Sequence, residues 1–420
     1  MGAEGTRSIT GAWAVAAAAA ALLAVTQGFR SSLGLFLSPI NTATGLGLAT
    51  ISFALAASQL AAGVAQPLVG RLAERIGNAR LIVAGALATA AAVAVLPWLR
   101  SAAGLTAGFV AVAVGGTALA SAPVLIAAVI ARVPPAFRGR ASGVVGAGGS
   151  AGQLVIGPAS QAGIAAIGWT GTLLALSGLT LLCAALARAF RAAPPAAAAG
   201  AAAAGRDAAA VQAARRVRSQ ALRDRSFWCL AASFFACGFH VSFLLAHMPG
   251  FIESCRLPPS LAGAWLAIIG VCNVAGSLGA GFLVERVPAR TMLVVLYALR
   301  GAVVLAFAAL PVTADSVLAF SVAIGLTYMA TLPPTSALVG QLYGTRNVAV
   351  LFGVVMLVHQ AGSFLGVWAG GVVLEATGGY DALWTLDALL AFAAVLACLG
   401  IRTPSGWSLV GRPALVADPR

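Results

Sequence analysis

Apolar residues fill long stretches of the chain, and short polar or charged segments separate these stretches. Most stretches approach the roughly 20 residues that an α-helix needs to cross a hydrocarbon core about 30 Å thick. Glycine and proline inside them are compatible with helices in lipid, because neighbouring helices supply new partners for the freed backbone groups. The pattern predicts twelve membrane spans, at residues 12–38, 49–70, 79–99, 103–131, 141–163, 167–189, 226–250, 261–284, 290–311, 315–340, 348–374 and 382–402.

A polar segment, residues 191–225, divides the chain near its middle. It contains Pro194-Pro195, an alanine and glycine tract, and an arginine cluster after Asp207. We expect a linker that is helical in part after Asp207 and that can contact anionic headgroups. The resulting organisation is a terminal segment 1–11, a six-helix bundle 12–190, the linker 191–225, a six-helix bundle 226–402 and a tail 403–420.

The composition excludes a water-soluble globule. Hydrophobic residues make up 60% of the 420 residues and charged residues only 9%, too few to cover a normal polar surface. The six cysteines show neither metal-ligand spacing nor a disulfide framework, and five of them fall inside apolar stretches. We therefore expect an all-α membrane protein without a metal or other cofactor, and a monomer.

The net charge of +14 could indicate nucleic acid, but the distribution of the charges indicates a membrane topology instead. All 25 basic residues are arginine, and arginine-rich and arginine-poor loops alternate along the chain. If the N-terminus is cytoplasmic, the outer loops contain only Arg100 and Arg256, while the inner segments contain nearly all the others and Arg30 and Arg300 lie inside spans. This positive-inside asymmetry predicts both termini in the cytoplasm. Arginine- and alanine-rich, lysine-free usage favours a bacterial inner membrane.

The two halves of the sequence repeat each other at a nearly constant offset. Gly28-Phe29-Arg30 recurs as Gly238-Phe239-His240, exactly 210 residues later. Gly115 and Pro123 recur at the same offset as Gly325 and Pro333. The repeat argues against a cleaved signal peptide in the alanine-rich first stretch. Two parallel six-helix repeats imply a pseudo-two-fold axis along the membrane normal, with a substrate site between them near the midplane.

The segment Gly70-Arg71-Leu72-Ala73-Glu74-Arg75-Ile76-Gly77 resembles the loop signature of the major facilitator superfamily. Glu74 stands where aspartate is usual, and Asn78-Ala79-Arg80 replaces the basic pair that follows. The resemblance extends over residues 11–402 and implies the twelve-helix fold of that family, with alternating access. It also implies that the chain is a transporter.

A shortened form of this motif recurs at Glu285-Arg286. An acid and an arginine at a helix end can bond to a neighbouring helix and hold the cytoplasmic side closed until substrate binds. On this interpretation Gly70, Arg71, Glu74, Arg75, Gly77, Glu285 and Arg286 form a gating motif. The alternative is that the arginines only set the topology.

Within that superfamily, Gly28 to Phe36 and the pair Phe227-Trp228 are similar to bacterial members of the monocarboxylate and oxalate/formate porter group. Those relatives have a basic residue in the first helix, where this chain has Arg30. Animal monocarboxylate carriers have an Asp and an Arg in the eighth helix, where this chain has Asn273 and Ser277. The resemblance implies transport of a small organic anion, and the departure leaves the exact substrate open.

Ionisable residues inside the spans are the first candidates for function, because a mid-bilayer arginine costs at least about 2.5–3.5 kcal/mol. Arg30 shares a polar, small-residue helix face with Thr26 and Gly34, and its planar fork matches a carboxylate. The alternative is an anchor to backbone carbonyl groups. His240 occupies the repeat-equivalent position and can bind substrate, carry a proton or pack as a neutral side chain.

Uncharged polar residues in the spans add further candidates, which either line a water-filled path or join helices by hydrogen bonds. The second span contributes Gln59, and the eighth contributes Asn273. The fifth and eleventh spans contribute the repeat-related group Gln153, His359 and Gln360. All five are assigned with Arg30 and His240 to the substrate path.

Arg300 and Asp387 lie in the ninth and twelfth spans, which are peripheral in the implied fold. Counted from opposite faces of the membrane, they differ in height by roughly 6 Å at 1.5 Å per residue. A long arginine can bridge that gap. We therefore expect a structural ion pair between them, with substrate contact by Arg300 as the alternative.

These observations predict a secondary transporter for a mono- or dicarboxylate, working by proton symport or anion exchange. An exporter of drug-like or amphipathic compounds is the alternative, and a channel or non-transporting receptor is a third. The sequence contains no metal-spaced His/Asp/Glu group, no G-x-S-x-G motif and no Walker motif. It therefore favours neither an enzyme nor an ATP-driven pump.

Overall fold

The computed structural model describes residues 3–134, 137–191, 208–344 and 347–402. Within these ranges the regular structure is helical throughout, so the expected all-α membrane fold is confirmed. Eleven helical segments of the described chain are long and apolar enough to cross a membrane. The tail 403–420 and linker residues 192–207 lie outside the described residues.

We call the helices before residue 191 the first group. They are α1 (Ala3–Ser32), η1 (Leu33–Phe36), α2 (Leu37–Thr44), α3 (Leu48–Ile76), α4 (Asn78–Val95), η2 (Leu96–Trp98), α5 (Ala102–Leu119), α6 (Ala122–Ile130), α7 (Arg138–Leu182) and η4 (Cys183–Phe190).

The second group follows the linker helix α9 (Ala208–Ala221), which begins where the sequence predicted a helix after Asp207. It comprises α10 (Arg225–Ser254), α11 (Ser260–Leu283), α12 (Ala289–Ala309), α13 (Ala314–Tyr328), α14 (Leu332–Tyr343), α15 (Val348–Thr377) and α16 (Asp381–Leu399).

Several stretches expected as continuous spans are interrupted. The first changes into the 3-10 segment η1 between α1 and α2. The fourth breaks between α5 and α6, just before Pro123, and the tenth breaks between α13 and α14, just before Pro333. Proline has no backbone N–H and its ring clashes with the preceding turn, which explains both later breaks. The repeat-related prolines therefore interrupt related helices.

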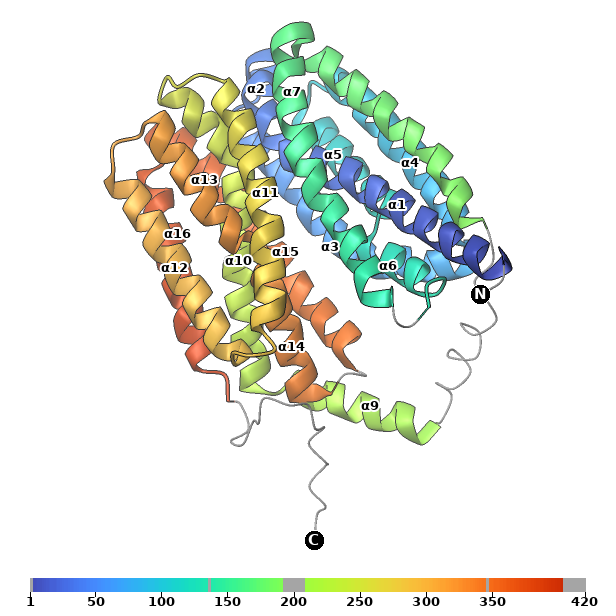
Figure 1. Ribbon diagram of the computed structural model, residues 1–420. Helices are drawn as coiled ribbons and strands as arrows, with labels where there is room; N and C mark the ends of the chain where they lie inside the picture. Colours follow the sequence, from blue (N-terminus) through green and yellow to red (C-terminus); the bar gives the residue numbers. More distant parts are fainter. Residues whose placement is uncertain (1–2, 135–136, 192–207, 345–346, 403–420) are drawn as a thin grey trace.

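One candidate span, 138–190, contains two helical legs. Gly168 adopts φ 75° and ψ 166° inside α7, a backbone conformation that glycine reaches without a steric penalty. Figure 1 shows the ribbon turning back at the top of α7 and descending beside α4. The legs 138–167 and 169–182 therefore run in opposite directions.

The two groups of helices lie side by side. In Figure 1 the first group, blue to green, occupies one side and the second group, yellow to red, occupies the other. Helix α9 lies at the end of the molecule where α1 begins and α16 ends. We call this end the α9 face, and we call the opposite end, where α2 ends and α3 begins, the far face.

Very close helix packing holds each group together, and the same contact occurs in both. A Cβ on Gly28 in α1 would lie 2.5 Å from the carbonyl oxygen of Gly152 in α7. A Cβ on the repeat-related Gly238 in α10 would lie 2.0 Å from the carbonyl oxygen of His359 in α15. Both distances are shorter than atoms allow, so only glycine fits. Such approaches drive helix association in lipid, where the hydrophobic effect between helices is weak.

The two groups contact each other mainly through α3 with α15 and α7 with α11. The first contact extends from Ser52 beside Gly371 to Gly63 beside Gln360. On the other side, the amide of Asn273 in α11 donates to the Ser150 hydroxyl in α7 over 3.0 Å. Gly63 and Asn273 lie near the middle of α3 and α11, so these contacts between the groups extend from the far face to about the middle of the helices.

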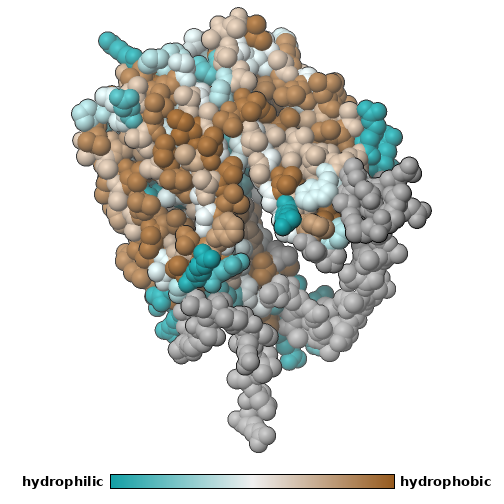
Figure 2. Space-filling view, in the orientation of Figure 1, coloured by the Kyte–Doolittle hydropathy of each residue, from teal (hydrophilic) through white to brown (hydrophobic). Residues whose placement is uncertain are grey.

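Large apolar side chains cover the outer surface of the helices. Figure 2 shows brown, hydrophobic residues over the sides of both groups and teal, hydrophilic residues toward the two ends. The most exposed apolar side chains include Leu182 (71%), Leu396 (70%) and Phe282 (66%). A surface of this kind is stable only against lipid.

At the far face, a carboxylate of the second group caps a helix of the first. The backbone N–H of Ala49, in the first turn of α3, donates to Oε2 of Glu375 over 2.9 Å. Gly47, which precedes the helix with φ 86°, leaves room for this carboxylate. A negative charge at a helix N-terminus satisfies a free N–H and complements the helix dipole. Glu375 therefore links the two groups at the far face.

We expect Glu375→Ala to loosen the start of α3. Loss of a cap costs about 0.5–2 kcal/mol, so the amides of residues 48–52 should exchange with deuterium about 2- to 30-fold faster. Hydrogen exchange with mass spectrometry on the purified protein measures this rate. Glu253→Ala, which removes another exposed acid from the same face, is the matched control and should leave it unchanged. Equal exchange in all three proteins would contradict a cap by Glu375.

Candidate functional site

Arg30 lies in the last turn of α1, where a cation is favoured by the helix dipole. Its neighbours Phe29 and Ser31 are buried, while Arg30 itself is half-buried. The guanidinium Nη2 donates to Oε1 of Gln59 in α3 over 2.6 Å. The described hydrogen-bond partner of this cation is thus a neutral carboxamide and not an acid.

The bond to Gln59 continues across the boundary between the two groups. Nε2 of Gln360 in α15 donates to the backbone carbonyl of Gln59 over 2.8 Å. Oε1 of Gln360 lies 3.2 Å from Nδ1 of His359, whose ring packs against Phe234 with a centroid distance of 4.8 Å. Arg30, Gln59, Gln360 and His359 therefore form one connected polar path between the groups.

Gln153 and Tyr328 adjoin this path from the other side. Gln153 in α7 is 7% exposed, and its Oε1 has no described hydrogen-bond partner. Its side chain is in polar contact with the phenol of Tyr328, at the end of α13, and the charge of Arg30 also acts on that phenol. The unpaired amide oxygen of Gln153 is available to a donor group on a ligand.

Asn273 is fully engaged in holding the structure. Besides its bond to Ser150, its Oδ1 accepts the backbone N–H of Met329 over 3.2 Å and the Ser277 hydroxyl over 3.3 Å. Met329 lies in the break between α13 and α14. Asn273 therefore supports this break and the contact between groups, and its polar atoms are already bonded.

Arg300 in α12 is 1% exposed, and its side chain binds the end of α13 at the same break. Nη2 donates to the carbonyl of Thr327 over 2.5 Å and to that of Tyr328 over 3.3 Å, and Nη1 lies 3.3 Å from Sγ of Cys237. The last carbonyls of a helix lack intrahelical partners and carry partial negative charge, so they attract a guanidinium. The Tyr297 ring stacks near it, 5.7 Å from Cζ.

The prediction from the sequence that Arg300 and Asp387 form an ion pair is wrong. Oδ2 of Asp387 instead lies 2.6 Å from Nδ1 of His240, and these two side chains are 0% and 2% exposed. Arg300 still acts on Asp387 electrostatically, but its Nη2 donates to the carbonyls at the end of α13. His240 therefore belongs to this buried pair and not to the path that contains Arg30.

The residues of the expected gating motif lie at the α9-side ends of α3 and α11. Arg71, Glu74, Arg75, Glu285 and Arg286 are exposed, and no cross-helix bond is described for them. Gly77 ends α3 with φ 83°, and Gly70 lies seven residues before it in the same helix. Their role as a gate stays a prediction.

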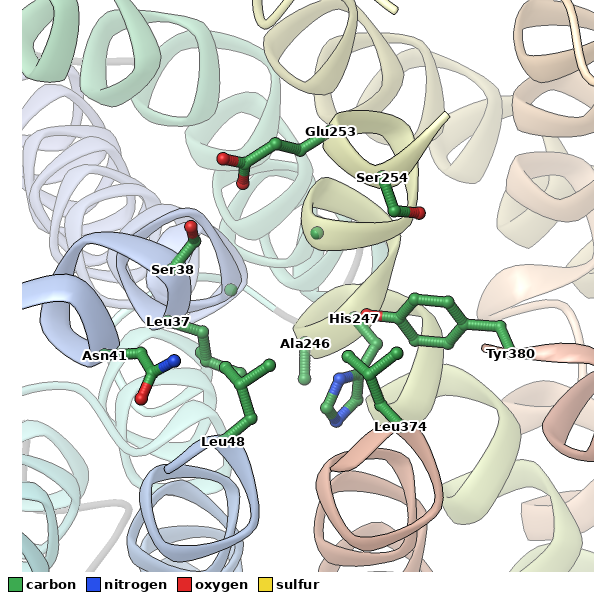
Figure 3. Close-up of a pocket in the computed structure, with 12 residues that line it drawn as sticks. Leu37, Ser38, Asn41, Leu48, Ala246, His247, Glu253, Ser254, Leu374 and Tyr380 are labelled. Atoms are coloured by element: carbon green, nitrogen blue, oxygen red, sulfur yellow. The ribbon is translucent and has the colours of Figure 1, made fainter. Parts of the chain in front are cut away.

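A cavity of about 320 Å³ lies at the far face, between α2, the start of α3 and the end of α10. Figure 3 shows Glu253 and Asn41 on opposite sides of it, with His247 and Tyr380 along one wall. Burial and the charge of Glu253 raise the pKa of the Tyr380 phenol, so its hydroxyl remains protonated. Nε2 of His247 is bonded to the Val367 carbonyl over 2.8 Å.

Sequence reasoning missed Glu375, Tyr328 and Cys237. Glu375 was passed over because it follows an apolar span, although an acid there faces the start of another helix. One sequence feature could have indicated Tyr328, because this residue lies just before the helix break that precedes Pro333. Cys237 lies inside an apolar stretch, and no local pattern of the sequence indicates its contact with Arg300.

Comparisons with known proteins agree with this geometry. A family model described as Major Facilitator Superfamily matches residues 19–360 and 257–417. The chain is 25% identical over 360 residues to an uncharacterized MFS-type transporter, YcxA, of Bacillus subtilis, covering 84% of this chain and 86% of the relative. It is 26% identical over 386 residues to monocarboxylate transporter 11 of Mus musculus, covering 88% and 83%.

Solved structures show the same fold. A bacterial homologue of the human lysosomal transporter Spinster, in an inward-facing and occupied conformation, superimposes with a TM-score of 0.69 at 16% identity. The alignment covers 92% of this chain and 94% of that one. Its inward-facing, unoccupied form gives 0.67, also at 16% identity.

We expect the two arginines to differ in their contribution to stability. Arg300→Gln removes donors from two buried carbonyls, each worth about 1–3 kcal/mol, so the melting temperature of the detergent-solubilised protein should fall clearly. Arg30→Gln removes one bond from a half-buried group and should lower it much less. Thermal unfolding followed by tryptophan fluorescence compares them, and equal losses would contradict the structural role of Arg300.

Proposed function

The chain belongs to the major facilitator superfamily, and on that premise we propose that it is a secondary active transporter of a small organic anion. The observation that carries this proposal is Arg30, a half-buried cation between the two groups whose described partner is neutral Gln59. Because a carboxylate binds a guanidinium through two charge-assisted hydrogen bonds, it competes well with a carboxamide. The name of the mouse relative, a monocarboxylate transporter, supports this substrate class.

We propose twelve membrane spans in two six-helix bundles, related by a pseudo-two-fold axis along the membrane normal. The reversal at Gly168 supports the count, because it divides the segment 138–190 into two spans. The matched contacts of Gly28 and Gly238 support the symmetry. The expected boundaries, 12–190 and 226–402 around the linker 191–225, are proposed on the same grounds.

The α9 face is proposed to lie in the cytoplasm of a bacterium, with both termini on that side of the inner membrane. Exposed arginines gather there, at the ends of α3 and α11 and along α9, whereas Arg100 and Arg256 are at the far face. The described contacts between the groups begin at the far face and extend to about the middle of α3 and α11, which supports a conformation that is closed outward. The similar solved structures, both in inward-facing conformations, support that orientation.

Transport then proceeds by alternating access, as proton symport or anion exchange. The anion reaches Arg30 through the α9 face and displaces the carboxamide of Gln59. The backbone carbonyl of Gln59 accepts a hydrogen bond from Gln360 in the other bundle. The residue whose side chain the anion displaces therefore also belongs to the contact between the bundles. Glu375 must release α3 when the far face opens. A monomer suffices for this cycle.

We expect Arg30→Gln to raise the KM for a carboxylate about 10- to 100-fold, since a hydrogen bond to a charged group is worth about 1.5–3 kcal/mol. Uptake of radiolabelled acetate, lactate, oxalate and succinate into proteoliposomes measures it, with and without a pH gradient. Arg30→Lys, which retains the charge but not the fork, should lie between wild type and Arg30→Gln.

Arg100→Gln is the matched control, because it removes an exposed arginine at the far face that is bonded only to a backbone carbonyl. Its KM should equal that of wild type. The panel also includes an amphipathic amine. Transport of the amine without any carboxylate, or full carboxylate uptake by Arg30→Gln, would contradict the proposal.

A further inference from the structure

A second polar cluster lies inside the second group, beside the path that contains Arg30. Its centre is the pair of His240 in α10 and Asp387 in α16, joined over 2.6 Å and at most 2% exposed. Arg300 and Tyr297 of α12 adjoin it. The aromatic ring of Trp384, one turn before Asp387, packs against Phe243, Phe307 and Phe320 and closes the cluster toward the far face.

This cluster is incompletely bonded, although it is fully buried. Three of its polar atoms have no described hydrogen-bond partner: His240 Nε2, Asp387 Oδ1 and Arg300 Nε. Each such atom costs about 1–3 kcal/mol, and a structural ion pair would be expected to use them. Unsatisfied groups concentrated at one place indicate a site that binds something during the working cycle.

The geometry of His240 indicates which species is bound. When Nδ1–H donates to Asp387, the ring is neutral and Nε2 carries a free lone pair. A proton added at Nε2 gives an imidazolium whose charge Asp387 stabilises. The site is too closely packed for a substrate, but it needs only room for a proton.

The charged and titratable groups near His240 are one acid, one arginine, and several cysteine, tyrosine and histidine side chains. Asp387 of α16 is the acid paired with His240, and Arg300 of α12 is the cation that acts electrostatically on Asp387. Further titratable groups that act on one another beside this pair are Cys237 of α10, Tyr297 of α12, Tyr328 of α13, His359 of α15 and Cys398 of α16. Occupancy of His240 by a proton therefore depends on how much positive potential Arg300 and its surroundings supply.

A short route connects this cluster with Arg30. Arg300 is bonded to the carbonyl of Tyr328, and the phenol of Tyr328 is acted on by the charges of both Arg30 and Arg300. An anion bound at Arg30 reduces the positive potential along this route. It thereby favours a proton on His240, and the proton in turn favours the anion, because such coupling is reciprocal.

We propose that His240 and Asp387 form the proton-binding site that couples a pH gradient to anion transport. This inference rests on the proposed function and decides between its two modes in favour of symport. One proton binds Nε2 of His240 from the side with the lower pH and leaves to the other side with the anion. One monoanion and one proton cross together, so the transport step moves no net charge.

The test compares two modes of transport in proteoliposomes for wild type, Asp387→Asn and His240→Gln. A symporter with a one-to-one ratio accumulates its anion up to about tenfold per unit of pH gradient. Both variants should lose this accumulation while retaining exchange of labelled for unlabelled anion at equal pH. Wild-type accumulation should respond to the pH gradient and not to the membrane potential.

His247→Gln is the matched control, since His247 is a second buried histidine of α10 whose Nε2 is bonded to a backbone carbonyl. It should accumulate the anion as wild type does. Accumulation by Asp387→Asn or His240→Gln would overturn the proposal. Loss of exchange together with accumulation, in variants that elute as folded protein, would also overturn it, because a purely structural pair predicts that result.

A measurement without substrate separates this proposal from the proposed function. Infrared difference spectra of the purified protein, recorded as the pH is lowered, should show a histidine protonation band that His240→Gln lacks and His247→Gln retains. If that band is present but no carboxylate is transported, the anion substrate is wrong and the proton site stands. If carboxylates are transported but the band is unchanged in His240→Gln, the proton site is wrong.

Discussion

The bonds between Arg300 and the carbonyl end of α13 are the interaction on which the interior of the second group depends. In lipid, every backbone polar group must find a partner within the protein, and the break before Pro333 leaves several without one. Arg300 supplies donors to Thr327 and Tyr328. Because Nη2 of Arg300 is directed at these carbonyls, Asp387 pairs with His240 instead.

Close packing imposes a second constraint, which is the same in both halves. Where glycine lets two backbones touch, as at Gly28 and Gly238, neighbouring side chains are held at fixed positions on their helices. The residues that follow these glycines by two, Arg30 and His240, are therefore placed equivalently. Their surroundings differ, because α3 presents Gln59 to one and α16 presents Asp387 to the other.

Much of the fold could be predicted from the sequence, since the lengths of the apolar stretches and the internal repeat can be recognised in the sequence itself. The estimate of helix height was also useful, because it brought Arg300 and Asp387 within electrostatic reach of each other. The hydrogen-bond partner of each polar side chain could not be predicted. It depends on the rotation of α10 and α12 about their axes and on the carbonyls that a broken helix exposes. Neither is encoded in the residues at the site itself.

These placements explain why two arginines at similar depth have different chemistry. The charge of Arg300 is shared with helix-end carbonyls and lies near Asp387, so it adds little attraction for an anion in the path. The charge of Arg30 meets only the dipole of a carboxamide and is partly exposed between the groups. A neutral partner stabilises a guanidinium enough for folding, but it binds it less strongly than a carboxylate does. The difference between those two partners is the free energy available for substrate binding.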